Sequence, residues 1–173
     1  QDVREGDTVD IKRAGDVIPQ IISVDLDKRT KGSSKVSLPK RCPSCNTVLV
    51  KIEGEAILRC TMGLDCPAQR IGALIHFVSR NALNIDGLGE RIIELLVDKN
   101  LVSNFADLFR LEIKDIIDLE GFGEKSATNL IHSIQESRET TLPRFIYSLG
   151  IREVGEATAC LLYTSPSPRD LDL

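Results

Sequence analysis

Four of the five cysteines lie between residues 42 and 66, and their spacing constrains the fold more than any other feature. They follow the pattern Cys42-x2-Cys45-x14-Cys60-x5-Cys66. Two short-range groups of thiolates joined by a hairpin-length spacer can converge on one tetrahedral Zn²⁺. Because four protein ligands leave no open position for a substrate, such a site stabilises structure and performs no catalysis.

Disulfide bonds are the alternative for these cysteines, and the rest of the sequence favours zinc. The cysteine count is odd, and the first residues are polar with no apolar segment of the kind that directs secretion. Within the spacer, residues 48–52 and 56–59 are apolar-rich and flank Glu53-Gly54, which predicts a short hairpin that returns the chain to the cluster. The remaining cysteine, Cys160, is expected to be a small core residue.

Composition limits the class of protein. A chain of 173 residues that is 42% hydrophobic and 28% charged can form one compact domain or several small ones in series. It has no apolar run of about 18 residues, so no membrane span is expected. Aromatic residues make up only 4% of the chain, which argues against a protein that binds single strands by stacking bases.

The net charge of −4 alone would not favour a nucleic-acid partner, but the local distribution of charge matters more. Residues 28–41 form a basic connector without any acidic residue. Its basic residues are Lys28, Arg29, Lys31, Lys35, Lys40 and Arg41. Two interpretations remain open: a solvated linker, or a basic strap that follows a phosphate backbone.

Residues 1–27 are rich in β-branched side chains and carry turn signals at Gly6-Asp7 and at residues 14–16, which predicts β structure. Pro19 is expected at an edge or a bulge. Two strands do not form a stable sheet alone, so this region either packs on the rest of the chain or ends a larger β domain.

From Pro67 onward the pattern becomes helical. Apolar residues recur at i, i+3, i+4 and i+7 over residues 71–78, which predicts an amphipathic helix attached to the cysteine module. Further short helices are expected at about residues 90–99, 104–110, 112–118, 124–138, 142–149 and 155–162. His76 and His132 are assigned structural or surface roles, because no carboxylate or nucleophile accompanies either at a useful spacing.

The helical region contains an internal repeat. The strings Asp86-Gly87-Leu88-Gly89-Glu90, Glu120-Gly121-Phe122-Gly123-Glu124 and Arg152-Glu153-Val154-Gly155-Glu156 recur at intervals of 34 and 32 residues. Each joins two apolar helical stretches, which is the arrangement of a helix-hairpin-helix. Small residues let the turn approach a backbone closely, and the unpaired N–H groups that open the second helix can bind a phosphate oxygen. Such contacts position a protein on nucleic acid without reading its sequence.

The three copies differ in ways that predict unequal roles. The second has Lys125 after its turn and Ala127 as a small packing residue, whereas the first has Arg91 and a bulkier residue at these two positions. In the third, Glu153 replaces the leading glycine, and its carboxylate would repel a phosphate unless Arg152 or a partner neutralises it. We therefore expect the second copy to bind DNA more strongly than the third.

Several strings, in order along the chain, carry a family resemblance. They are Gly6-Asp7-Thr8-Val9, Arg13-Ala14-Gly15-Asp16-Val17-Ile18-Pro19, Cys66-Pro67-Ala68-Gln69, His76-Phe77-Val78-Ser79-Arg80 and Leu149-Gly150-Ile151-Arg152-Glu153-Val154-Gly155. From about residue 3 to about residue 160 the chain resembles bacterial NAD-dependent DNA ligases. The resemblance implies an enzyme that encircles nicked duplex DNA and seals the nick, with NAD as adenylate donor and Mg²⁺ as its metal.

The fold class expected from residues and resemblance together is multi-domain α+β. Residues 1–27 would end an oligonucleotide-binding (OB-fold) β-barrel, 28–41 connect it, 42–66 form a four-cysteine zinc finger, and 67–162 form an all-α helix-hairpin-helix domain. Residues 163–173 contain two prolines that interrupt the last helix, so they are interpreted as a non-native or disordered tail.

The resemblance also implies roles for individual residues. Structural Zn²⁺ would be held by Cys42, Cys45, Cys60 and Cys66. Arg13 would face the nick, with a plain surface arginine as the alternative. The hairpin glycines would present backbone amides to minor-groove phosphates: Gly87, Gly89, Gly121, Gly123 and Gly155. Their charge partners would be Arg91, Lys125 and Arg152.

The sequence also departs from the family. It contains no Lys-x-Asp-Gly adenylation motif, only part of the barrel, and neither a fourth hairpin nor a BRCT domain. We therefore expect no catalytic or NAD-binding residue in this chain, which would not ligate alone and would act with an adenylation domain as a monomer in the bacterial cytoplasm, at the nucleoid. The alternatives are a non-catalytic zinc and helix-hairpin-helix DNA adaptor, and a metal-stabilised protein-interaction module.

Overall fold

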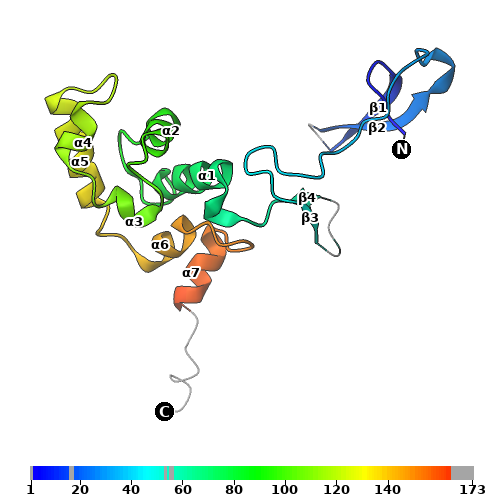
Figure 1. Ribbon diagram of the computed structural model, residues 1–173. Helices are drawn as coiled ribbons and strands as arrows, with labels where there is room; N and C mark the ends of the chain where they lie inside the picture. The colour runs from blue at the N-terminus through cyan, green and yellow to red at the C-terminus, as the bar shows by residue number, and fades with distance from the viewer. Residues whose placement is uncertain (1, 16–17, 53, 55–56, 165–173) are drawn as a thin grey trace, which may run out of the picture.

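The computed structural model describes residues 2–15, 18–52, 54 and 57–164. Three parts follow one another along the chain (Figure 1): an N-terminal β hairpin, a small cysteine module and a helical bundle. This is the mixture of small antiparallel sheets and helices that the sequence predicts. Among the described residues, no helix is both long enough and apolar enough to cross a membrane.

The N-terminal hairpin consists of β1 (Thr8–Ala14) and β2 (Ile18–Asp25). The strands are antiparallel, with Thr8 opposite Asp25, and their register shifts between Asp10 and Ile11. Pro19 lies in β2 opposite Arg13. Both strands are edges of a two-stranded sheet, so Pro19 occupies the kind of position expected of it.

A short 3-10 turn, η1 (Leu26–Lys28), follows β2 and is fastened back onto the start of the chain. The Arg29 guanidinium donates to both carboxylate oxygens of Asp7, at 2.9 and 2.8 Å, and to the backbone oxygen of Asp2 at 2.7 Å. The Asp7 side chain is only 1% exposed. These hydrogen bonds from Arg29 lower the pKa of the Asp7 carboxyl. Arg29, which belongs to the basic connector in the sequence, therefore holds the hairpin closed.

The cysteine module contains the predicted hairpin. β3 (Val50–Lys51) pairs with β4 (Leu58–Arg59), and a bridge joins Arg41 to Val48. The 3-10 turn η2 (Gly63–Asp65) then leads directly into the first helix. Of the expected hairpin, residues 53, 55 and 56 lie outside the described residues.

The helical bundle has the element order that the sequence predicts. It begins with α1 (Pro67–Val78), preceded by Cys66 as its N-cap residue. There follow α2 (Glu90–Asp98), α3 (Phe105–Leu108), α4 (Ile113–Ile117), α5 (Glu124–Glu136), α6 (Leu142–Ser148) and α7 (Glu156–Thr164). Because helices this short are marginal alone, their stability depends on the shared core.

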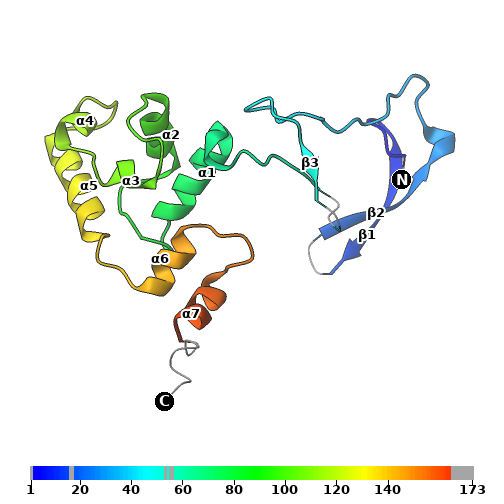
Figure 2. The same cartoon turned by 60° about the horizontal axis from the view of Figure 1, so that its bottom comes forward.

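Helix α1 supplies the centre of that core and contacts both α2 and α6 (Figure 2). Phe77 is 2% exposed, and its ring stacks on Phe105 with centroids 4.5 Å apart. On another face of α1, Nε2 of His76 lies 2.8 Å from the Tyr147 carbonyl oxygen, and the two rings meet edge to face. The structural role expected for His76 is thus confirmed.

Cys160 was expected in the core, and this prediction is wrong. Its side chain is exposed, whereas the preceding Ala159 is fully buried. Successive residues of an α-helix are rotated by about 100°, so only one of these two neighbours can face the bundle. The interpretation of the C-terminal tail falls largely outside the described residues, since the structure describes nothing after Thr164.

Two phenylalanines provide a test of this core. Phe77→Ala should lower the free energy of unfolding by about 3–5 kcal/mol, because it opens a cavity beside Phe105. Phe145→Ala is the matched control, since Phe145 is 43% exposed, and it should lower the free energy by less than about 1.5 kcal/mol. Urea titration followed by circular dichroism measures both; similar losses would contradict this placement of the core.

Candidate zinc centre and nucleic-acid interface

The four clustered cysteines meet at one point in the structure. Their sulfur atoms all lie within 4.8 Å of one another. The Cys42 and Cys66 sulfurs are 3.9 Å apart, and those of Cys45 and Cys60 are 3.5 Å apart. Four sulfurs placed tetrahedrally about 2.3 Å from a zinc ion are separated by about 3.8 Å. The donor set therefore fits a closed structural Zn²⁺ site in both chemistry and dimensions.

The first pair of cysteines sits on a tight turn. The Cys42 amide donates to the Thr47 carbonyl oxygen at 2.8 Å, and the Asn46 amide donates back to the Cys42 carbonyl oxygen at 2.9 Å. Asn46 takes a left-handed backbone conformation with φ of 58°, which asparagine tolerates better than most residues. This turn brings the sulfurs of Cys42 and Cys45 to the same side.

The second pair of cysteines is tied to the start of α1. The Cys66 amide donates to the Gly63 carbonyl oxygen at 3.1 Å, and Cys66 itself precedes the first residue of α1. The Gln69 side chain, in the first turn of α1, donates to the Cys60 carbonyl oxygen at 2.9 Å. The Ala68 amide donates to the Ser44 hydroxyl at 3.2 Å. The helix is thus fastened to both halves of the cluster.

The pKa values of the Cys45 and Cys60 thiols are shifted in opposite directions by their surroundings. Hydrogen bonds from Thr47 lower the pKa of the Cys45 thiol to about 6. A backbone hydrogen bond at Met62 acts in the same direction on Cys60, but burial and the neighbouring thiols outweigh it and raise its pKa to about 11. Zinc displaces the protons from all its thiol ligands, so the bound ion removes this inequality. Arg41 and Arg70 donate to the carbonyl oxygens of Asn46 and Leu64.

The three repeated strings form three equivalent turns. Each turn begins at the residue just before the string, and its backbone carbonyl oxygen accepts from the amide three residues later. The pairs are Leu88 to Ile85 at 3.4 Å, Phe122 to Leu119 at 3.0 Å and Val154 to Ile151 at 3.0 Å. The second helix then starts after a glycine, at Glu90, Glu124 and Glu156. Its fourth residue is fully buried in every copy, as Ile93, Ala127 and Ala159. The helix-hairpin-helix prediction is confirmed in its geometry.

The third turn keeps this geometry with an unfavourable residue. Gly87 and Gly121 have φ of 82° and 88°, and Glu153 occupies the equivalent position with φ of 64°. Positive φ is a conformation that residues with a side chain rarely adopt. Arg152 lies beside it, with Nε 3.3 Å from a Glu153 carboxylate oxygen. The third copy thus carries both backbone strain and a carboxylate, with Arg152 as the neighbouring cation.

Two serines, which the sequence reasoning missed, use amides of the hairpin turns. The Gly123 amide, expected to face a phosphate, donates to the Ser126 hydroxyl at 2.9 Å. The Asp86 amide donates to the Ser133 hydroxyl at 2.8 Å, which joins the first turn to α5. The third residue after a helix N-cap is the position from which a capping-box side chain, usually Glu or Gln, accepts from the N-cap amide, so the position of Ser126 was a recognisable signal. Ser133 was not, because its partner lies 47 residues away.

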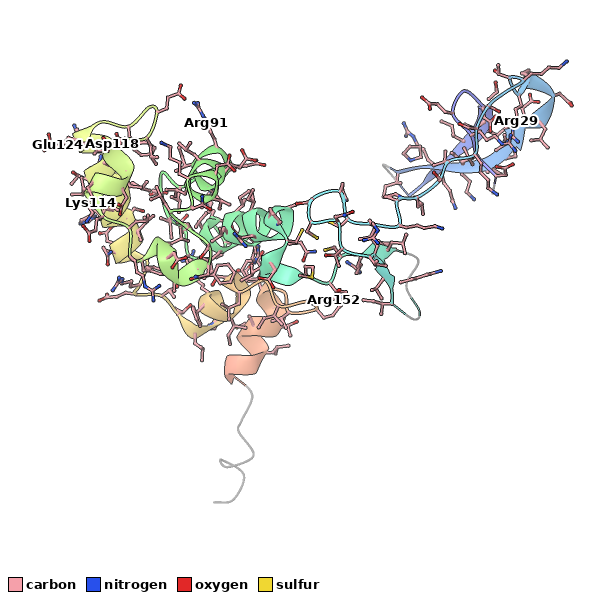
Figure 3. The ribbon with its side chains drawn as sticks, viewed as in Figure 1. Arg29, Arg91, Lys114, Asp118, Glu124 and Arg152 are labelled. Atoms are coloured by element: carbon pink, nitrogen blue, oxygen red, sulfur yellow. The ribbon has the colours of Figure 1, made fainter. Side chains whose placement is uncertain are left out.

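The predicted DNA-contact residues are spread over the molecule. Arg91 and Lys125 are exposed on the first turns of α2 and α5, and Arg91 points away from the bundle (Figure 3). Arg13 lies in β1, at the opposite end of the molecule from α5 in both views of the ribbon (Figures 1 and 2). The structure therefore brings the cysteines together and repeats the turns, but places Arg13 apart from them.

Comparison with known proteins assigns the cysteine module and the first two hairpins to two separate domain families. Residues 41–68 match the model of the NAD-dependent DNA ligase C4 zinc finger domain. Residues 79–136, which contain the first two hairpins, match that of the SAM-like helix-hairpin-helix tandem. The chain is 55% identical over 161 residues to the DNA ligase of Hahella chejuensis, an alignment covering 93% of this chain and 24% of that protein. It is 56% identical over 158 residues to the DNA ligase of Marinobacter nauticus, with 91% and 23% covered.

The chain contains the C4 zinc finger domain of NAD-dependent DNA ligases, and over most of its length it is similar to bacterial DNA ligases. The cysteine cluster is the structural zinc site of a ligase zinc finger. The chain spans about a quarter of the length of the curated ligases it matches, at 24% and 23%. The third hairpin lies beyond the residues that the helix-hairpin-helix model matches, and its assignment rests on the turn geometry alone.

Replacing a single cysteine tests the zinc centre. A structural zinc site contributes about 10–16 kcal/mol, so losing one of four thiolates should remove roughly 3 kcal/mol of it, over a hundredfold in affinity. Cys60→Ser should therefore lose zinc to a competing chelator, whereas Cys160→Ser, outside the cluster, should retain it. Zinc per chain, measured by atomic absorption after chelator titration, distinguishes them; equal retention would exclude Cys60 as a ligand.

An exchange of residues between the second and third turns tests the backbone strain. Glu153→Gly should raise the free energy of unfolding by about 0.5–1 kcal/mol, because relief of the left-handed conformation exceeds the entropy that glycine adds to the unfolded chain. Gly121→Glu should lower it by about 1 kcal/mol or more, since its φ is 88°. Thermal unfolding of the two variants measures these changes in the free energy of unfolding. Glu153→Gln removes the charge but keeps the side chain, so it should match the parent chain if the backbone conformation is responsible.

Proposed function

We propose that this chain is the DNA-clamping part of an NAD-dependent DNA ligase that seals nicks in double-stranded DNA. The observation that carries the proposal is the repetition of one turn geometry at three places in a chain that also contains the ligase zinc finger. Each turn leads into a helix whose first N–H groups have no partner within the helix, which is a structure suited to binding a phosphate.

The amides that open the second helices are the proposed donors. In the first copy they include those of Glu90 and Arg91, and in the second those of Glu124 and Lys125. The Gly123 amide is not one of the proposed donors, because it already donates to the Ser126 hydroxyl. Gly123 instead leaves room beside the turn, since it has no side chain. Because phosphate oxygens are the same at every base pair, binding would be independent of DNA sequence and would weaken steeply with salt.

The hairpins are proposed to contribute unequally. The cation after the turn is Arg91 in the first copy and Lys125 in the second, but the equivalent residue of the third is Ala157. The third copy also places the Glu153 carboxylate where the others have glycine. Fewer cations and an additional anion both oppose phosphate binding, so the second copy should bind DNA more strongly than the third.

Catalysis is proposed to reside outside the residues described. The sequence contains no Lys-x-Asp-Gly motif to carry adenylate. The 173 residues alone should therefore not seal nicks, and NAD and Mg²⁺ would act at an adenylation domain with which this chain cooperates. We further propose that the protein works as a monomer in the bacterial cytoplasm, at the nucleoid.

An aspartate placed at each helix N-cap tests the unequal hairpins. Gly123→Asp and Gly155→Asp add a side-chain oxygen that caps the helix and repels phosphate, and neither position has an atom within 4 Å of an added Cβ. Gly123→Asp should weaken duplex binding about tenfold or more, through loss of a charge-assisted contact, and Gly155→Asp much less. Fluorescence anisotropy with a labelled duplex measures both; equal losses would remove the predicted ranking.

A chimera tests the proposed activity. The 161 aligned residues of this chain would replace the corresponding segment of the Hahella chejuensis DNA ligase. The chimera should seal a nicked duplex in the presence of NAD and Mg²⁺, and this chain alone should bind the duplex without sealing it. A zinc-loaded, folded chimera that neither binds nor seals nicked DNA would refute the proposed function.

A further inference from the structure

The basic connector is held in place at its middle and at its end. At its middle, Nη1 of Arg4 donates to the Ser33 carbonyl oxygen at 3.0 Å, and a backbone bridge joins Arg4 to Lys35. At its end, the Leu49 amide donates to the Lys40 carbonyl oxygen at 3.0 Å. Between these anchors the chain has no helix and no strand, and it runs from the β hairpin to the cysteine module (Figure 1). Such anchoring is not expected of a freely solvated linker.

The structure divides the connector's basic residues into two groups. Three are occupied: Lys28 lies 2.8 Å from the Asp25 carboxylate, Arg29 is bound to Asp7 and Asp2, and Arg41 donates to the Asn46 carbonyl oxygen at 2.9 Å. Lys31, Lys35 and Lys40 are exposed, and none of them forms an ion pair with a carboxylate in the described part of the chain.

Three acidic side chains near the connector are already paired with other cations. Asp2 is paired with Arg4 at 3.0 Å, Asp7 with Arg29 and Asp25 with Lys28. From residue 28 to residue 41 the sequence contains no aspartate or glutamate. The positive charge of the three remaining lysines is therefore uncompensated within the connector, and its natural counterpart is a regular array of anions.

The spacing of these lysines suits a duplex backbone. An extended chain rises about 3.3 Å per residue, so Lys35 and Lys40 can stand up to about 16 Å apart. The turn in which the Ser33 amide donates to the Thr30 carbonyl oxygen keeps Lys31 and Lys35 closer than the roughly 13 Å of an extended chain. One DNA strand carries a phosphate for about every 3.4 Å of helix axis, so each lysine can reach a different phosphate group. Each such contact would release condensed counterions independently.

We propose that Lys31, Lys35 and Lys40 form a second phosphate-binding surface for duplex DNA, separate from the hairpin turns. The inference rests on the proposed function, namely that the chain binds duplex DNA. The connector precedes the cysteine module and the hairpins follow it, so the two surfaces lie on opposite sides of the zinc centre along the chain. DNA that touches both would be held over a longer path than the hairpins alone provide.

The salt dependence of binding tests this surface, because each lysine–phosphate contact adds about one to the slope of log affinity against log salt concentration. The double variant Lys31→Gln and Lys35→Gln should reduce the slope by about two, and adding Lys40→Gln should bring the reduction to about three. The measurement is anisotropy of a labelled duplex with the full chain over a range of NaCl concentrations. Zinc content and thermal unfolding should be unchanged, since all three side chains are exposed.

The matched control removes the same number of charges from occupied lysines. Lys28→Gln is combined with Lys114→Gln, because these lysines are paired with Asp25 and Glu112. The Lys28 and Lys114 side chains are 68% and 74% exposed. This control should change the slope by less than one. An equal change in both double variants would show that only net charge matters and would overturn the proposal, as would an unchanged slope in the connector variant. If the parent chain itself does not bind duplex DNA, the proposed function fails as well.

Discussion

The convergence of four thiolates on one zinc ion is the constraint on which the rest of the structure depends. Cys66 contributes a sulfur to the cluster and also precedes the first residue of α1, so the metal fixes where that helix begins. Helix α1 in turn supplies Phe77 to the core and His76 to the contact with Tyr147 before the third hairpin. A closed site without an open coordination position thus governs the position of the DNA-binding helices while taking no part in catalysis.

The three hairpins show how one backbone geometry can be kept while its chemistry changes. The turn hydrogen bond and the buried fourth residue of the second helix are common to all three. At the left-handed position, glycine adopts the required φ at no steric cost, whereas Glu153 must be held there by the packing of α6 and α7 around it. Conservation of shape therefore does not require equal affinity for phosphate, and we propose that the charges around each turn set the difference.

The connector shows the same separation between residue type and role. Arg29 and Lys31 are two positions apart in a continuous basic run, yet Arg29 is 15% exposed and fastened to Asp7 while Lys31 is exposed and unpaired among the described carboxylates. The Arg29–Asp7 pair holds the hairpin closed, whereas the later lysines are exposed to solvent. In the DNA-clamping role proposed for this chain, such a row of cations would supplement the proposed amide contacts of the hairpins.

The sequence by itself determined the zinc ligands, the order of the helices and the three hairpin turns, because each depends on spacing within a short segment. It failed wherever a role depends on a distant neighbour or on rotation about a helix axis. Cys160 and Ala159 are both small residues, and only packing decides that Ala159 faces the core. Likewise, only the fold brings Asp7 to Arg29 and Ser133 to the Asp86 amide, which lie 22 and 47 residues away along the chain. Local pattern fixes which elements form; the tertiary structure decides which polar groups they leave available for binding.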